Sequence, residues 1–401
     1  MGIYRDLGKN RGVFRILAAQ LTARFPVGML SIAMLLHIEI THGSYGAAGL
    51  VLGAASVGQA IAGPLTSRWM GAWGMRPVLI LTSLVCATTL TTVALVHTTI
   101  PLTMVLAFVM GLSTPPITPA VRTIYPKMVP SKQLAALFTL DASAQEIIWV
   151  IGPVLAVMVS TQVNTTIGLL TAVVFMVFGG LWFILSPELG RVRIPRSRRR
   201  LGAVLTRPTV VVATIVSFLF VASFAAVEAG VVSVFGHEGL DSGIVLGIFS
   251  AGSIFGGLLF GHRTLTPWSL TIRVAIVAVG TILCLFSLDM WWLSAMLFFG
   301  GFGVAPSLAA IFTMVSSTVK FSETAEAYGW VGTGQLIGAA LGSAIAGFSI
   351  DAVGPRGAIV ASVVFLVACV IAAAIGSRWI PDMRGRDAAP IPDTEPITLP
   401  S

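Results

Sequence analysis

Charged residues are scarce in this sequence. Asp, Glu, Lys and Arg make up 10% of its 401 residues, while 56% are hydrophobic and the mean hydropathy is +0.94. Soluble domains carry about 25% charged residues, so this chain has too few polar side chains to cover a water-soluble globule. The sequence therefore predicts an integral membrane protein in contact with the lipid bilayer.

Cysteine is also rare, and no pattern of metal ligands is visible. Cys86, Cys284 and Cys369 lie in three different apolar runs, without the spacing of a disulfide pair or a metal site. The five histidines lie near the ends of apolar runs, and no catalytic set of His, Asp or Cys occurs at one depth. We therefore expect no metal, no cofactor and no enzyme activity. The net charge of +8 is spread over short segments, which argues against nucleic acid as a partner.

Long apolar runs are what the sequence has in abundance. A membrane-spanning helix needs about 20 apolar residues, and windows of that length predict twelve spans. The fold class is thus all-α and integral to the membrane, with twelve transmembrane helices in two six-helix bundles. We expect the first bundle over residues 1–190, a basic linker over 191–207, the second bundle over 208–380 and a disordered tail over 381–401.

Lys and Arg are distributed unequally between the two faces of this predicted bundle. Arg356 is the only one in the loops of one face, whereas the central loop of the other face, residues 187–208, alone holds seven arginines. Cytoplasmic loops carry an excess of Lys and Arg. The sequence therefore places both termini in the cytoplasm, and we expect the protein in the cytoplasmic membrane of a bacterium.

The two halves of the chain resemble each other. "GLVLGAASVGQAIAGPL" (49–65) and "GIVLGIFSAGSIFGGLL" (243–259) are identical at eight of 17 positions. At an offset of 190 residues, Gln145 matches Gln335 and Gly152 matches Gly342. Six-helix repeats about an axis along the membrane normal are a transporter architecture, in which the substrate site lies between the halves near the midplane.

With these features the chain resembles the major facilitator superfamily over residues 1–380. That superfamily has a Gly-x-Leu-x-Asp-Arg-x-Gly-Arg-Arg-type signature after its second span. "GPLTSRWMGAWGMRP" (63–77) lacks the acidic residue, with Ser67 or Gly71 in its place, but retains Gly63, Leu65, Arg68, Gly74 and Arg76. The resemblance implies that Gly63, Arg68, Gly74 and Arg76 belong to a cytoplasmic gate, to which we add Arg122 at the nearby end of span 4. Glu323 and Glu326 lie at the cytoplasmic surface before span 11, where they are either gate partners of Arg68 or Arg76 or part of a solvated turn.

Span 5 carries a second resemblance. Its Gly152–Pro153 pair is similar to the core of the antiporter signature of drug:proton exchangers, with Ile148 and Ala156 where that signature has glycines. The superfamily's arginine in span 4, four residues before a glycine, is replaced by Ala107. The resemblance implies proton-coupled exchange.

Glu146 is the acidic residue predicted to lie deepest in the membrane, near the middle of span 5. An ionised carboxylate at mid-bilayer costs about 2.5–3.5 kcal/mol, so it must bind a proton or pair with a cation. Arg24 in span 1 is the only cation at a similar depth. Glu146 either alternates between a proton, Arg24 and a cationic substrate, or forms a static pair with Arg24, or is a lone solvated carboxylate.

Other polar and bend-forming residues complete the candidate site. Asp141 is shallower and either meets water or Arg122 or takes part in coupling, and Glu228 in span 7 lies either at the rim or in the external half of the cavity. The prolines of "STPPITP" in span 4 should bend or open that helix. The residues expected at the cavity or at helix breaks are Trp149, Gly152, Pro153, Pro115, Pro116, Gln145 and Gln335.

The sequence therefore predicts a secondary active transporter that works by alternating access. Among the possible transport functions we favour proton-coupled efflux of lipophilic or cationic compounds, because the intramembrane charges are few and mainly acidic. The alternative is proton-coupled uptake or facilitated transport of a metabolite such as a sugar or nucleoside, which would favour a more polar lining. A membrane protein without transport activity is a remote alternative. We expect a monomer whose partners are a small-molecule substrate, protons and lipid.

Overall fold

The computed structural model describes residues 2–10, 12–195, 200–235, 241–261, 263–384 and 389–393. Within these residues, eleven helices are long and apolar enough to cross a membrane, and a twelfth apolar segment, Ser269–Leu283, is shorter. The expected all-α fold with twelve spans is confirmed in this form. Three linker arginines, at 196, 198 and 199, and two histidines, at 237 and 262, lie outside the described residues.

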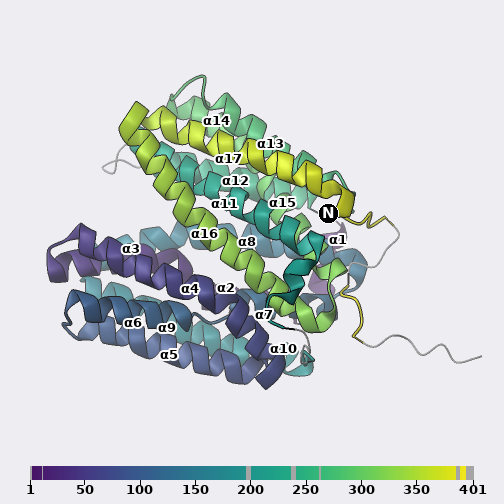
Figure 1. The fold of residues 1–401 in the computed structure, drawn as a ribbon, viewed down its shortest axis with the longest axis horizontal. Coiled ribbons are helices and arrows are strands. Elements are labelled where there is room, and N and C mark those ends of the chain that lie inside the picture. Colours follow the sequence, from purple (N-terminus) through teal and green to yellow (C-terminus); the bar gives the residue numbers. More distant parts are fainter. Residues whose placement is uncertain are drawn as a thin grey trace, which may run out of the picture.

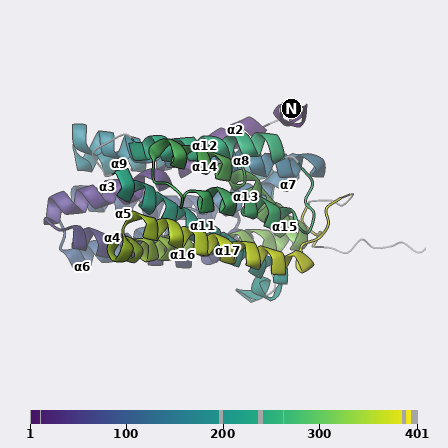
Figure 2. The same ribbon diagram turned by 90° about the horizontal axis from the view of Figure 1, so that it is seen from above.

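The chain forms two lobes, one from each half of the sequence (Figures 1 and 2). The helices of the N-terminal lobe are α1 (Gly2–Lys9), α2 (Val13–Arg24), α3 (Pro26–His42), α4 (Tyr45–Trp73), α5 (Met75–Leu95), α6 (Ile100–Leu112), α7 (Ile117–Met128), α8 (Ser131–Gln162), α9 (Thr165–Leu185) and α10 (Pro187–Arg191). After the turn η1 (Ala203–Thr206), the C-terminal lobe comprises α11 (Pro208–Phe235), α12 (Asp241–Phe260), α13 (Ser269–Leu283), α14 (Met290–Gly301), α15 (Val304–Thr318), α16 (Phe321–Val353), α17 (Pro355–Gly376) and the turn η2 (Ser377–Trp379).

Three spans consist of two helices with a break between them. The first breaks after Arg24, where Pro26 begins α3, and the fourth breaks between Leu112 and Ile117. The fourth break contains Pro115 and Pro116, so the helix opens where the proline pattern predicted. The tenth span breaks in the corresponding place, between α14 and α15.

The internal repeat is visible in the packing of glycines. A Cβ atom added to Gly58 would meet the backbone of Phe108, and one added to Gly252 would meet the backbone of Phe298. These contacts join α4 to α6 and α12 to α14, which are equivalent pairs in the two halves. Because only glycine lets these backbones approach so closely, the repeated glycines in the sequence correspond to a repeated packing arrangement.

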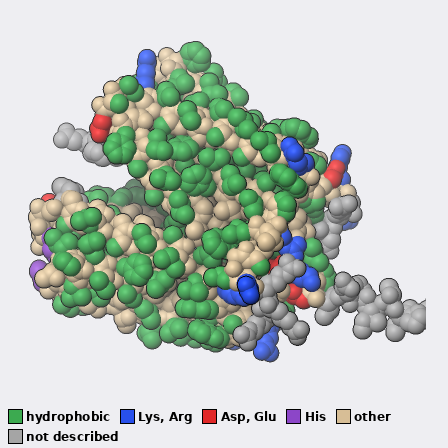
Figure 3. Space-filling view, viewed as in Figure 1, with side chains coloured by type: hydrophobic (Ala, Val, Ile, Leu, Met, Phe, Trp, Pro, Cys, Tyr) green, Lys and Arg blue, Asp and Glu red, His purple; other side chains and the backbone are tan. Residues whose placement is uncertain are grey.

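The lobes contact each other mainly through α4 with α16 and through α8 with α12 and α15. Their contact is concentrated at one end of the bundle, where α1, α10, η1 and the C-terminal segment also lie (Figure 1). We call it the basic end, because Arg15, Arg68, Arg76, Arg207 and Arg263 lie there, and the other the opposite end. Figure 3 shows a hollow between the lobes that opens toward the opposite end.

The C-terminal segment differs from the expectation of disorder from Pro381 onward. The Met383 amide donates to the Leu265 carbonyl at 2.9 Å. Ile391 pairs with the α15–α16 loop, since its amide donates to Val319 and its carbonyl accepts from Phe321. The buried Met383 side chain and the backbone pairing of Ile391 give this proline-rich segment two anchor points that its composition concealed.

Candidate functional site

Glu146 lies where the two lobes meet in the middle of the bundle. Its carboxylate accepts hydrogen bonds from Ser253 at 2.9 Å and from Ser250 at 3.1 Å, and both serines are on α12. Closer to the basic end, the Thr139 hydroxyl on α8 donates to the Gly261 carbonyl at 3.1 Å. We call this line of contacts the α8/α12 seam. Two of its hydrogen bonds across the lobes have the Glu146 carboxylate as acceptor.

The expected pair between Arg24 and Glu146 is wrong in this structure, because Arg24 lies against Asp141. Its Nη1 is 3.4 Å from Asp141 Oδ1, and its Nη2 donates to Gln145. The reason is helical geometry: Asp141 and Gln145 are four residues apart and share one face of α8. Glu146 is about 140° around the helix from Asp141 and points at α12 instead.

Asp141 is the centre of a buried group that we call the arginine cluster. Its members are Gln20 and Arg24 of α2, Arg122 of α7, and Asp141 and Gln145 of α8. Asp141 is fully buried and accepts from Gln20 at 2.9 Å, from Arg24 at 3.4 Å and from Arg122 at 3.4 Å. The expected alternative that Asp141 meets Arg122 therefore agrees with the structure, and the water-exposed alternative does not.

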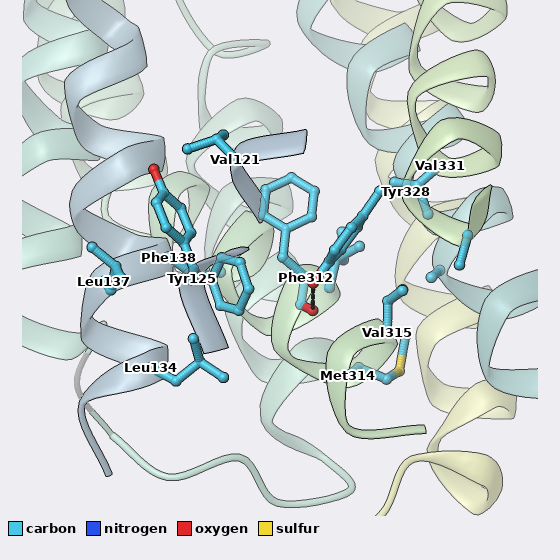
Figure 4. Packing of buried hydrophobic residues seen from close by; sticks show 14 of the residues in the cluster. Val121, Tyr125, Leu134, Leu137, Phe138, Phe312, Met314, Val315, Tyr328 and Val331 are labelled. Atoms are coloured by element: carbon cyan, nitrogen blue, oxygen red, sulfur yellow. Dashed lines mark hydrogen bonds between the residues drawn. The ribbon is translucent and has the colours of Figure 1, made fainter. Parts of the chain in front are cut away.

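An aromatic group closes the space between the lobes at the basic end. Phe138 of α8 lies 6.2 Å from Phe312 of α15 and 6.4 Å from Tyr328 of α16, measured between ring centroids (Figure 4). The Tyr328 hydroxyl donates to the Phe312 carbonyl at 3.0 Å. The Arg122 guanidinium lies 3.4 Å from the centroid of the Phe312 ring. The arginine cluster is thus covered by an aromatic side chain of the other lobe.

The second line of contacts between the lobes, which we call the α4/α16 seam, contains most of the predicted gate. Arg68 Nη1 is 3.2 Å from Glu326 Oε2, and the other Glu326 oxygen accepts from the Gly202 amide at 2.7 Å. Gly63 and Gly329 pack so closely that a Cβ on Gly329 would lie 2.6 Å from the Gly63 carbonyl oxygen. Glu326 therefore joins both lobes and the linker.

Arg76 and Gly74 belong to the N-terminal lobe alone. Arg76 donates to the carbonyls of Ile184 and Ser186 at 3.0 Å and 3.3 Å, which are the last carbonyls of α9. Gly74 has a φ of +94°, a conformation that glycine allows between α4 and α5. Of the two arginines expected to pair with Glu326, the structure selects Arg68.

Glu228 on α11 and Trp149 on α8 are exposed side chains. The Ser223 carbonyl of α11 accepts from Ser362 of α17, and Glu228 lies about 140° around α11 from it, between the contacts with α12 and α16. Glu228 is exposed and has neither a hydrogen bond nor an ion pair to the described residues. Trp149 is 51% exposed on the α8 face opposite its lipid-facing aliphatic residues.

The remaining expected residues have packing positions. A Cβ on Gly152 would lie 2.9 Å from the backbone of Gly28, so this glycine permits close contact between α8 and α3. Pro153 lies inside α8 in the following position, and Gln335 is half-buried on α16. These positions leave Glu146 and the arginine cluster as the polar groups at the centre of the molecule.

Sequence reasoning missed Gln20, Ser250 and Ser253. Serine and glutamine are common enough that a single one carries little signal. Ser250 was visible as a member of the repeat, matched to Ser56, and Gln20 lies one helical turn before Arg24. These two positions could have indicated Ser250 and Gln20 as site residues, whereas nothing in the sequence indicated Ser253.

Comparisons with known proteins agree with this architecture. A family model described as Major Facilitator Superfamily matches residues 16–272 and 265–399. Among curated protein sequences, none matches this chain.

Solved transporter structures have a similar fold. The crystal structure of the human organic anion transporter MFSD10 (TETRAN) has a TM-score of 0.70 at 15% identity, covering 90% of this chain and 99% of that one. A bacterial homologue of the iron transporter ferroportin in an outward-facing state has a TM-score of 0.75 at 11% identity, covering 92% and 100%. The proton:xylose symporter XylE bound to 6-bromo-6-deoxy-D-glucose has a TM-score of 0.72 at 12% identity, covering 94% and 97%.

Proposed function

Because this chain belongs to the major facilitator superfamily, we propose that it is a proton-coupled transporter that exports small lipophilic compounds, with Glu146 as its proton site. It works as a monomer in the bacterial cytoplasmic membrane, with the basic end and both termini in the cytoplasm. The excess of arginine at the basic end supports this orientation.

The observation that carries the proposal is the position of Glu146 between the lobes. Its carboxylate accepts two hydrogen bonds, both from α12 of the other lobe. Hydrogen bonds to an ionised acceptor are about twice as strong as those between neutral groups. A proton on Glu146 therefore weakens the α8/α12 seam, which links proton binding to the relative position of the lobes.

The shape of the molecule supports alternating access. The lobes meet at the basic end and part at the opposite end, where a hollow opens (Figure 3). With the basic end in the cytoplasm, this conformation faces outward. We infer that the exposed side chains of Trp149 and Glu228 face this hollow, so a lipophilic compound leaving the site would pass an indole ring and a carboxylate without an ion pair to the described residues.

Proton movement in inside-out membrane vesicles tests this function. A pH gradient is established, and lipophilic compounds of positive, zero and negative charge are added to vesicles with wild type, Glu146→Gln or Glu39→Gln. Glu39 is the matched control, because it lies in the last turns of α3 toward the opposite end. We expect at least one compound to dissipate the gradient in wild type and in Glu39→Gln, but not in Glu146→Gln.

Two results would contradict the proposal. An equal response in Glu146→Gln would remove Glu146 as the proton site and direct attention to Asp141 and Glu228. A response to none of the compounds, together with sugar or nucleoside uptake in right-side-out vesicles, would replace export by metabolite uptake.

A further inference from the structure

The arginine cluster contains more positive than negative charge. Arg24 and Arg122 are two guanidinium groups, and among the described residues Asp141 is the only carboxylate that forms an ion pair with either of them. One positive charge is therefore left over. All three side chains are buried, with relative exposures of 6%, 4% and 0%. A buried charge without a partner is strongly unfavourable, so this group requires an explanation.

The two ion pairs within the cluster are also long. Each oxygen of Asp141 lies 3.4 Å from one arginine nitrogen, whereas charge-assisted N–H···O bonds measure about 2.7–2.9 Å. Arg122 approaches Asp141 through Nε alone, and its two terminal amino groups have no hydrogen bond to the described residues. Guanidinium groups typically bind carboxylates through two parallel bonds. The fork of Arg122 is thus present but unused.

A second buried donor lies beside Arg122. Tyr125 follows it by three residues on α7, which places both side chains on the same face of the helix. The Tyr125 side chain is fully buried, and its hydroxyl lies near the Asp141 carboxylate without a hydrogen bond of good geometry to the described residues. A buried hydroxyl so placed is a donor beside the two arginines that an anion could use.

We propose that the arginine cluster binds the carboxylate of an organic anion, which is the charged end of the transported compound. Arg122 provides its unused fork, Arg24 adds the second positive charge, and the Tyr125 hydroxyl donates to the same group. Asp141 holds the arginines when no substrate is bound and is partly displaced when the substrate carboxylate arrives. The inference rests on the proposed transport function and names its substrate class.

The cover of the cluster indicates the side from which the anion enters. Phe312, which lies 3.4 Å over the Arg122 guanidinium, belongs to the other lobe. When the lobes part at the basic end, Phe312 moves away with α15 and Arg122 becomes accessible from that side. The substrate therefore binds from the basic end, which agrees with export.

Three probes of one shape separate anion binding from general lipophilic binding. Thermal unfolding of the purified full-length protein is measured with increasing 1-naphthoate, 1-naphthamide or 1-naphthylmethylamine, which carry a negative, zero and positive charge at neutral pH. We expect 1-naphthoate alone to raise the melting temperature. Stabilisation of equal size by the amide or the amine would overturn the proposal.

Variants then locate the site. In Arg122→Gln we expect the affinity for 1-naphthoate to fall at least tenfold, and Arg122→Lys should restore part of it because the charge returns without the fork. Arg356→Gln is the matched control, since Arg356 is exposed in the first turn of α17. Unchanged 1-naphthoate binding in Arg122→Gln would overturn the assignment. Should that variant fail to fold, the three-probe comparison in wild type decides alone.

The outcome of this binding experiment is independent of the vesicle test of proton coupling, because binding needs no pH gradient. Stabilisation by 1-naphthoate without proton movement in vesicles would contradict proton coupling and keep the anion site. Proton movement driven by 1-naphthylmethylamine but not by 1-naphthoate would keep the coupling and overturn the anion site.

Discussion

The α4/α16 and α8/α12 seams occupy equivalent places in the two repeats, yet they carry their charge at different depths. In the first, a Cβ on Gly63 would meet Thr333 and Gly329; in the second, a Cβ on Gly257 would meet Ser143 and Thr139. These partners are related by the 190-residue offset between the halves.

The polar residues break this symmetry. Glu326 forms its ion pair with Arg68 at the basic end of the α4/α16 seam, and the equivalent position on α8 is Ala136. Glu146 lies in the middle of the α8/α12 seam, and the equivalent position on α16 is Leu336. The difference teaches that the carboxylate of one seam forms an ion pair at the basic end, whereas the carboxylate of the other lies in the middle of the bundle, where we propose that the proton binds.

One distance reports on both seams. Spin labels on cysteines introduced at Lys132 and Thr264, which are exposed at the basic end of the two lobes, measure how far the lobes are apart. The native cysteines are buried, so they compete little for the label. The fraction of molecules with the basic end closed then gives the free-energy difference between the two conformations.

The largest effect is expected from Glu326→Ala. It removes the buried acceptor of Arg68 and Gly202, and hydrogen bonds to charged groups contribute about 1.5–3 kcal/mol. The closed conformation should lose about 3 kcal/mol relative to the open one, so the closed fraction should fall. Glu323→Ala is the control, because Glu323 is equally buried but pairs with Arg207 at the start of the C-terminal lobe. Similar opening in both variants would mean that Glu326 is no latch between the lobes.

Gly329→Ala should destabilise the closed conformation by about 2 kcal/mol relative to the open one, which is within the range for overpacking. Its new methyl group would meet the backbone of Gly63, which cannot move aside. In Gly257→Ala the obstacle is the Ser143 hydroxyl, which can rotate, so we expect a smaller shift. A larger shift in Gly257→Ala than in Gly329→Ala would reverse the ranking of the two seams.

Acidification should loosen the α8/α12 seam. Protonation removes the charge from Glu146 and with it about 1–2 kcal/mol of hydrogen-bond strength toward Ser250 and Ser253. The closed fraction should therefore fall as the pH is lowered, and this dependence should be absent in Glu146→Gln. A pH response that persists in Glu146→Gln would assign the titration to another carboxyl group.

The smallest effect distinguishes the equivalent hydroxyls of the two seams. Thr333 donates to the Ala60 carbonyl across the lobes at 2.9 Å. Thr333→Val should therefore destabilise the closed conformation by about 1 kcal/mol relative to the open one. The Ser143 hydroxyl is buried without a hydrogen bond to any residue that the structure describes, so Ser143→Ala should be neutral or slightly favourable. Equal losses in the two variants would show that Ser143 has a hydrogen bond in the membrane.

The sequence predicted the helices and the repeat well, because long apolar runs leave few alternatives in a bilayer. Depth along a helix was also predictable, and it placed Glu146 correctly in the middle of span 5. The partner of Arg24 was not predictable, because depth alone does not determine which face of α8 packs against α2. Only the packed structure shows that Asp141, and not Glu146, lies nearest to Arg24.

The pairing of Ile391 with Val319 and Phe321 has a practical consequence for expression plasmids. Residues 389–393 lie against the α15–α16 loop through these bonds, so a fusion made directly after Asp393 would begin beside that loop. Trimming the proline-rich tail to shorten the chain would also remove the partners of two backbone groups next to α16. A tag should therefore follow the intact tail through a flexible spacer.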